Sequence, residues 1–191
     1  MTETLNADFF QRAVMHTAAM DWQASPSPSV WRKRLDLAAG AETSRVTSVV
    51  RYDAGSSFAL HPHPCGEEIF VLDGVFAGKH GEYPAGTYLL NPQGFNHAPF
   101  SKQGCVLFVK LQQYPGTEHI TIDTKSANWP DTGVPGLRLL TLYDNGRGET
   151  VRLARFAPGC RVPAHDHVGG EELFVIAGEV ADEFGAYPAG T

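Results

Sequence analysis

The feature that most constrains the fold of this chain is a motif that occurs twice. The first copy reads Gly-x5-His-x-His-x3-Glu-x6-Gly from Gly55 to Gly74, and the second copy has the same spacing from Gly159 to Gly178. When residues 51–87 are aligned without gaps on residues 155–191, 17 of the 37 positions are identical. A repeat of this length indicates one structural unit used twice in tandem.

The second copy covers less of the unit than the first. The first copy continues into Gly-x5-Pro-x-Gly-x2-His, from Gly86 to His97, but at the constant offset of 104 residues the equivalent of His97 would fall at position 201, past Thr191. We therefore expect one complete unit and one incomplete unit, from a shortened chain or from a natural ending that a partner completes. An incomplete barrel exposes apolar surface, so we expect a homo-oligomer, which light scattering would test.

The local signals from Val30 onward are those of strands. Runs rich in β-branched and aromatic residues are separated by turns containing Gly, Pro and Asn, and they cover residues 44–52, 68–72, 86–90 and 105–111. Many short strands predict an all-β sandwich or barrel. We expect an N-terminal arm and linker over residues 1–29, with a short helix or extended segment inside it, a first domain over 30–120 and a second, incomplete domain over 137–191.

Composition excludes several classes of protein. Hydrophobic residues make up 42% of the 191 residues and charged residues 19%, which is typical of a globular chain. The net charge is −6, and the densest basic cluster is Arg32-Lys33-Arg34, which we interpret as a solvated strand or loop, so nucleic-acid binding is not expected. No segment approaches the ~18 apolar residues of a membrane span. The three cysteines and the lack of a secretory signal predict a cytoplasmic protein with reduced thiols.

The spacing of His61, His63, Glu67 and His97 predicts a metal site. Side chains at i and i+2 of a strand share one face, so both imidazoles of His61 and His63 can meet one ion. The turn Pro64-Cys65-Gly66 lets Glu67 join them, and a turn at Pro92-Gln93-Gly94 can deliver His97. Imidazole and carboxylate ligands suit a divalent first-row metal, and the residues alone do not choose among Fe, Mn, Zn, Ni, Co and Cu.

The second copy repeats three of these four ligand positions, as His165, His167 and Glu171. It has no fourth ligand in this sequence, so we expect weaker binding there. Cys65 aligns with Gly169, which indicates a thiol that is not a ligand. No catalytic residue can be named from the sequence.

These motifs resemble the signature motifs of the cupin superfamily. His61, His63 and Glu67 match the first motif, and His97 matches the last histidine of the second. Residues 66–74, 81–87 and 104–111 resemble the cupin domains of ChrR-type anti-sigma factors and their two-cupin relatives. The resemblance implies two tandem jelly-roll (double-stranded β-helix) barrels, the second incomplete, with one divalent transition metal (Fe, Zn, Mn or Ni) per complete cupin.

The resemblance leaves the function open between two classes. One is a metal-dependent oxygenase, specifically a non-haem dioxygenase, that acts on a small carbonyl compound. The other is a regulatory or sensor cupin that binds zinc or a small ligand without turnover, and a metal with a purely structural role is a third reading. In the family the anti-sigma members carry an N-terminal zinc module with cysteine ligands. No cysteine precedes Cys65, so an anti-sigma role is not expected.

Overall fold

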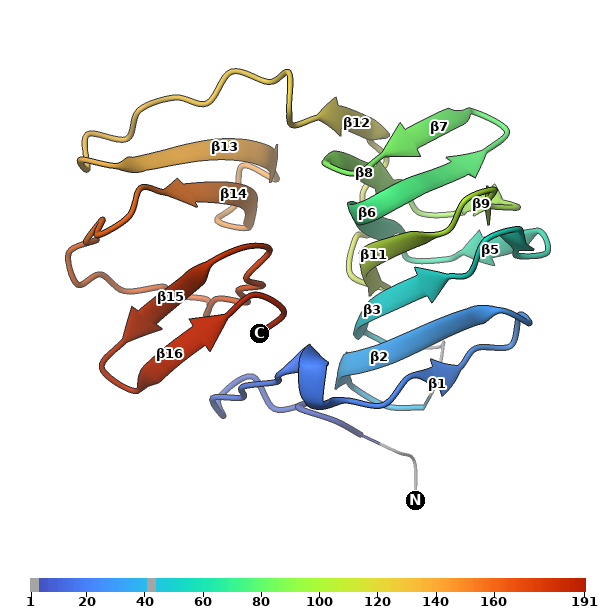
Figure 1. Cartoon of the computed structure of the whole chain (residues 1–191), viewed down its shortest axis with the longest axis horizontal. Helices are drawn as coiled ribbons and strands as arrows, with labels where there is room; N and C mark the ends of the chain where they lie inside the picture. The colour runs from blue at the N-terminus through green and yellow to red at the C-terminus, as the bar shows by residue number, and fades with distance from the viewer. Residues whose placement is uncertain (1–3, 41–43) are drawn as a thin grey trace. The chain divides into compact units, whose positions relative to one another are not determined.

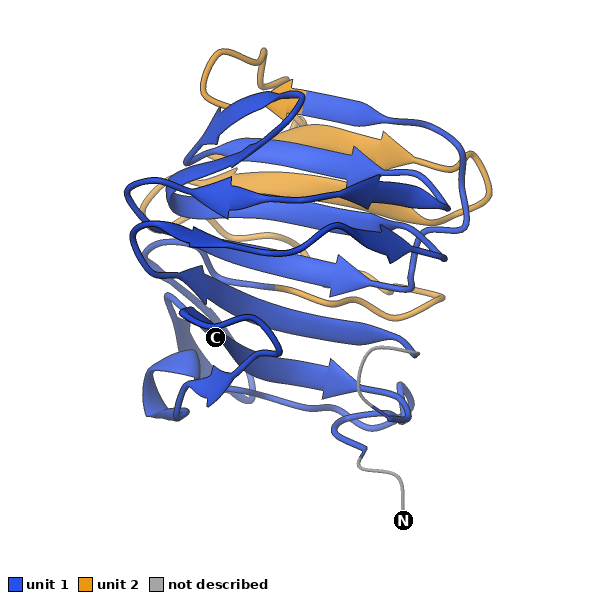
Figure 2. Ribbon diagram, turned by 90° about the vertical axis from the view of Figure 1, so that its right-hand side faces the viewer, with its two compact units in different colours: residues 1–121, 174–191 blue, residues 122–173 orange. Residues whose placement is uncertain are grey.

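The chain is built almost entirely of antiparallel strands, as the sequence predicts. The computed structural model describes residues 4–40 and 44–191, in two compact units: Met1–Thr121 with Phe174–Thr191, and Ile122–Leu173 (Figure 2). The one helical element in the described residues is a single 3-10 turn, η1 (Thr17–Ala19). None of the helical structure described here has the length and apolar character needed to cross a membrane.

A ten-stranded antiparallel sheet dominates the first unit. Its main path runs β1-β2-β3-β11-β6-β10-β4, and Figure 1 shows β1, β2, β3, β11 and β6 side by side in this order. The strands of this path are β1 (Gln23–Ala24), β2 (Val30–Leu37), β3 (Val46–Tyr52), β11 (Cys105–Leu111), β6 (Glu67–Gly78), β10 (Phe100–Ser101) and β4 (Ser56–Ser57). The other strands of the sheet are β7 (Gly81–Pro84), β8 (Thr87–Asn91) and β12 (Ile120–Asp123).

Strand β6 serves two walls of the barrel. Its first residues, from Glu67 to Phe70, pair with β8 and β11, whereas its last residues, from Val75 to Gly78, pair with β7. The register against β11 shifts between Val106 and Leu107, next to Gly74, whose φ is +71°. A bulge of this kind bends a strand and re-aims it. Gly74 therefore lies at the corner where one strand passes between the two walls.

Alternation along β11 decides which side chains enter the core. Cys105, Leu107 and Val109 are 3%, 2% and 7% exposed, which identifies them as the inward face of the strand. Phe108 points to the other face, where its ring lies 4.8 Å from that of Phe174. The core cluster consists of Val30, Tyr52, Ile69, Val71, Phe76, Leu89, Cys105, Leu107 and Val109.

The N-terminal arm is extended rather than helical, apart from η1. Arg12 contacts the hairpin of β15 (Glu179–Asp182) and β16 (Gly185–Pro188), with its Nη2 3.5 Å from a carboxylate oxygen of Asp182 and its guanidinium over the Phe184 ring. Further along, the Thr17 hydroxyl donates to the carbonyl oxygen of Gly190 at 2.7 Å. These contacts fasten the arm to the hairpin.

The second unit is organised around one hairpin, formed by β13 (Leu137–Asp144) and β14 (Thr150–Phe156). β13 begins at Leu137, where the sequence predicts the second repeat to start. The side chain of Arg155 stacks on Trp129, with its Cζ 3.9 Å from the ring centroid. Its counterpart in the first copy, Arg51, forms an ion pair, with Nε 3.1 Å from Asp53 Oδ1.

The corner at Gly74 gives a test of the fold. A methyl group on Gly74 would lie 2.1 Å from the carbonyl oxygen of Gly104, whereas one on Gly55, at φ +79°, would meet nothing within 4 Å. We expect Gly55→Ala to reduce the unfolding free energy by about 1 kcal/mol, the cost of left-handed backbone alone. We expect Gly74→Ala to cost about 3 kcal/mol or more, because the backbone must also move. Urea unfolding of both variants measures the difference, and equal costs would contradict the assignment of Gly74 as a packed corner.

Candidate metal centre

Two short strands and the start of β6 position the four residues predicted as ligands. β5 (His61–His63) pairs antiparallel with β9 (Phe95–His97), and the register places His61 directly opposite His97. Side chains opposite each other in an antiparallel pair point to the same face. Glu67 is the first residue of β6, so the turn after His63 returns the chain to the same place, as the sequence predicts.

One backbone carbonyl ties the two turns of the site together. The carbonyl oxygen of His63 accepts hydrogen bonds from the N–H of Gly66 at 3.2 Å and from the N–H of Gly94 at 2.8 Å. Gly66 and Gly94 have φ values of +73° and +79°, which glycine adopts without strain. The turn that leads to Glu67 and the turn that leads to His97 are therefore both fixed to His63.

The ligand atoms of the four side chains converge. His63 Nε2 and His97 Nε2 are 3.0 Å apart, and each lies 3.5 Å from one carboxylate oxygen of Glu67. One nitrogen from each of His61, His63 and His97 lies within 4.8 Å of the others. His63, Glu67 and His97 are each 6% exposed, whereas His61 is half-buried, so the site is reached from the side of His61.

A hydrogen bond fixes the tautomer of His61. Its Nδ1 lies 2.8 Å from the carbonyl oxygen of Ala59, which can only accept, so Nδ1 carries the proton. The lone pair of the neutral ring is then on Nε2. Orientation of a histidine ligand by a backbone carbonyl in this way is a regular feature of metal sites.

Burial controls the charge of the site. Desolvation, with a smaller repulsion from His61, lowers the pKa of His63 to about 4. Desolvation also lowers the pKa of His97 to about 3, with repulsion from His63, His61 and His80 adding to it. Both rings are therefore neutral at pH 7, and their short contacts with Glu67 are not imidazolium–carboxylate ion pairs. Desolvation raises the pKa of Glu67 to about 7, although a hydrogen bond from Asn91 opposes that rise.

The donor set fits a divalent metal ion. Neutral imidazoles are the form that binds metals, and the two facing Nε2 atoms of His63 and His97 can satisfy one another only if one of them carries a proton. Two nitrogens bonded to one ion at about 2.1 Å lie about 3.0 to 3.4 Å apart, which matches their 3.0 Å separation. His61, His63, Glu67 and His97 are thus the residues that could hold such an ion.

Two further groups support the site and were not found from the sequence. Asn91 Nδ2 donates to Glu67 Oε2 at 2.9 Å, and the two residues are direct partners in the β6–β8 pair. The sequence carries no local signal for this contact, because it depends on the register of β6 against β8. The rings of Phe58, Phe76 and Phe95 lie 5.2 to 6.2 Å from those of His61 or His97 and line the site with apolar surface.

The structure brings the three predicted residues of the second copy close together as well. His165 Nε2 and His167 Nε2 are 3.0 Å apart, and His167 Nε2 lies 3.6 Å from a carboxylate oxygen of Glu171. His165 Nδ1 lies 2.9 Å from the carbonyl oxygen of Pro163, which repeats the contact between His61 and Ala59. These three residues are exposed, unlike His63 and Glu67.

The fold and this histidine cluster define a cupin. The profile of the ChrR Cupin-like domain family matches residues 10–115 and 117–191, and the chain belongs to this family. None of the curated proteins compared with the chain matches it. The resemblance inferred from the sequence is therefore confirmed at the level of the family.

Two solved structures with TM-scores above 0.5 confirm the fold. A proposed dioxygenase from Nostoc punctiforme is similar with a TM-score of 0.58 and 14% identity, over 73% of this chain and 59% of that one. A proposed glyoxylate-induced protein from Pseudomonas aeruginosa is similar with a TM-score of 0.54 and 14% identity, over 72% and 60%. Rhodobacter sphaeroides SigE in complex with the anti-sigma ChrR matches with a TM-score of 0.42 and 20% identity, and there the chain spans 50% of the length of the matched chain.

The opposed pKa shifts predict how the stability of the metal-free protein depends on pH. His63 and His97 bind protons below about pH 6.5 in the unfolded chain but only near pH 4 and 3 when folded, so folding releases two protons in this range. Glu67 has the opposite effect between 4.5 and about 7. Between pH 4.5 and 6.5 these groups together lower the unfolding free energy by about 1.4 kcal/mol per pH unit as the pH falls, the slope for one proton.

The variant Glu67→Gln lacks the group that opposes the two histidines. Between pH 4.5 and 6.5 the slope of its unfolding free energy against pH should therefore be steeper than that of the wild type by about 1.4 kcal/mol per pH unit, the contribution of one proton. Urea unfolding at several pH values, with chelator present, measures both slopes. All other titrating groups are common to the two proteins and cancel in the difference. An unchanged slope would contradict the raised pKa of Glu67.

Proposed function

We propose that His61, His63, Glu67 and His97 hold one divalent first-row transition-metal ion, and that the protein is a metal-dependent oxygenase acting on a small carbonyl compound. The observation that carries the metal assignment is the convergence of the buried His63 and His97 nitrogens on each other and on Glu67. Iron, manganese, nickel and zinc all suit three imidazoles and a carboxylate.

The accessibility of the site supports chemistry rather than a structural role. Four protein ligands leave coordination positions open on an ion that prefers six, and the half-buried His61 marks the side from which a small molecule can enter. When bound, such an ion polarises a carbonyl and offers a position for O₂. The chain contributes the orientation of the ligands, through Ala59 and Asn91, and an apolar surround of Phe58, Phe76 and Phe95 that limits water.

Membership of the ChrR cupin-like family favours a second function, that of a regulatory cupin which binds zinc or a small ligand without turnover. Zinc sites without turnover have all positions filled by the protein, whereas catalytic ones keep a position open. Metal analysis of protein purified without added metal, followed by oxygen-uptake assays with small diketones, separates the two. Iron or manganese with uptake supports the oxygenase, whereas zinc near one ion per chain without uptake supports the regulatory function and overturns the oxygenase.

We also propose that the second copy of the motif belongs to a second cupin domain whose His165, His167 and Glu171 bind metal weakly. The repeated contact between a histidine Nδ1 and a backbone carbonyl two residues earlier supports this proposal. Exposure of all three residues is the physical reason for the lower affinity, because bulk water competes with the ligands.

Matched variants in the two copies test the metal site. We expect His63→Ala to lose the ion of the first site and to lower the melting temperature, because a central ligand is removed. Glu67→Gln should weaken binding less, since the amide oxygen still coordinates. His167→Ala, the equivalent change in the second copy, should leave the tightly bound ion in place. Metal content by mass spectrometry measures all three, and full occupancy in His63→Ala would overturn the ligand assignment.

A further inference from the structure

Tyr52, the last residue of β3, points into the barrel of the first unit. It lies directly opposite Cys105 in the β3–β11 pair, and Cys105 belongs to the inward face of β11. Side chains of residues that are paired in this way lie on the same face of the sheet. Tyr52 is 6% exposed and belongs to the core cluster, so its phenol group is enclosed by the barrel.

Two phenylalanine rings connect Tyr52 with the histidines of the centre. The centroid of the Tyr52 ring lies 6.0 Å from that of Phe58 and 5.9 Å from that of Phe76. The Phe58 ring in turn lies 5.2 Å from the ring of His61, and the Phe76 ring lies 6.2 Å from that of His97. Tyr52 therefore contacts the same two side chains that line the candidate metal centre.

The hydroxyl of Tyr52 is a hydrogen-bond donor without a protein acceptor. Within residues 4–40 and 44–191, no hydrogen bond involves this hydroxyl. A buried tyrosine hydroxyl ordinarily has a partner, because leaving it unsatisfied costs free energy. An acceptor atom of a ligand inside the barrel would recover that cost.

The charge of Glu67 acts on this phenol group. Burial raises the pKa of Tyr52 well above its usual range, and repulsion from the charges of Glu67 and Cys105 raises it further. The hydroxyl is therefore protonated at neutral pH and lies within the electric field of the carboxylate that is predicted to be a ligand. Tyr83 differs in this respect, because burial alone raises the pKa of its hydroxyl.

We propose that the Tyr52 hydroxyl donates a hydrogen bond to an oxygen atom of the small carbonyl compound held at the centre. This inference rests on the proposed function and adds a substrate-positioning residue to it. Ligand pockets are mostly apolar, and a few well-placed polar groups fix the orientation of the ligand. Phe58 and Phe76 supply apolar walls here, and Tyr52 supplies a neutral donor that matches a carbonyl oxygen, which can only accept.

Ligand titration of the full chain loaded with Co²⁺, followed by visible absorption, tests this proposal without an activity assay. The probe is pentane-2,4-dione, a small diketone whose oxygen atoms accept hydrogen bonds. Imidazole is the second probe, because its free ring position is an N–H donor once the other nitrogen has bound a metal. Cobalt content and melting temperature are measured on every sample.

The variant is Tyr52→Phe, which removes the hydroxyl and keeps the ring that packs on Phe58 and Phe76. Tyr83→Phe is the matched control. The Tyr83 ring also lies near Phe76, at 6.4 Å between centroids, but its pKa does not respond to Glu67.

Tyr52→Phe should weaken dione binding about three- to tenfold, the loss expected for one buried hydrogen bond, and should leave imidazole binding unchanged. Tyr83→Phe should change dione binding by less than about twofold. The proposal is overturned if the cobalt-loaded wild type does not bind the dione, if Tyr52→Phe binds it like the wild type, or if Tyr52→Phe weakens both probes equally, as a purely structural role would.

The cobalt content separates failure of this proposal from failure of the metal centre. Retained cobalt with unchanged dione affinity in Tyr52→Phe overturns the role of Tyr52 and leaves the metal centre standing. A wild-type chain that holds no cobalt overturns the metal centre, and the role of Tyr52 with it.

Discussion

The hydrogen bonds to the carbonyl oxygen of His63 are the constraint on which the centre depends. Two glycine N–H groups, of Gly66 and Gly94, reach this one oxygen from turns that are 28 residues apart in sequence. One turn delivers Glu67 and the other delivers His97. A methyl group on Gly66 would lie 2.2 Å from the carbonyl oxygen of Tyr114, so this turn is also packed against the chain beyond β11.

The free-energy cost of burying His63, His97 and Glu67 favours the binding of a cation at the site. Burial keeps His63 and His97 neutral and raises the pKa of Glu67, so the metal-free site holds groups that have lost their hydration without gaining charged partners. A divalent cation would reverse that penalty by supplying the missing charge and by binding the lone pairs. Metal binding and folding are for this reason expected to be coupled in the first unit. The corresponding residues of the second copy are exposed and keep their hydration, so we expect weaker coupling there.

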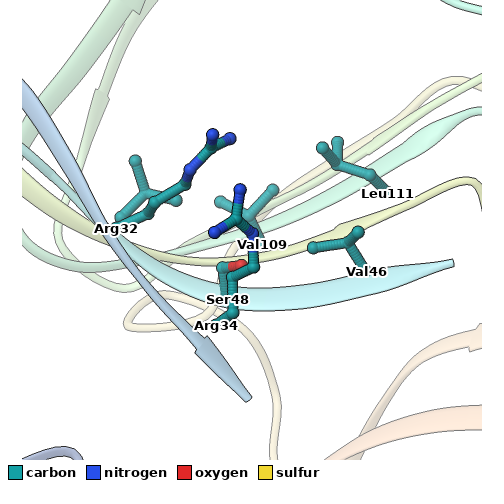
Figure 3. A pocket seen from close by; sticks show the side chains of 7 residues that line it. Arg32, Arg34, Val46, Ser48, Val109 and Leu111 are labelled. Carbon is teal, nitrogen blue, oxygen red and sulfur yellow. The ribbon is translucent and has the colours of Figure 1, made fainter. Parts of the chain in front are cut away.

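Strand register places Glu67 and the residues that line a small cavity on one face of one sheet. β6 supplies Glu67, and its neighbour β11 supplies Val109 and Leu111. β3 supplies Ser48 two strands away from β6, and β2 supplies Arg32 and Arg34 three strands away (Figure 3). The other positively charged residues of β2 and β3, Lys33 and Arg51, lie on the opposite face and contact the Trp22 ring.

The sequence by itself determined the repeat, the all-β class and the four residues whose side chains converge at the candidate centre. It could do so because alternation and turn-forming glycines act over a few residues, and because the spacing of His61, His63 and Glu67 is local. It could not show that Asn91 supports Glu67, that Trp22 meets Lys33 and Arg51, or that Arg32 and Arg34 face a cavity. Those facts depend on strand register and on which face of each strand is covered. Only the tertiary structure decides them, because a shift of one residue in register would send every one of these side chains to the other face of the sheet.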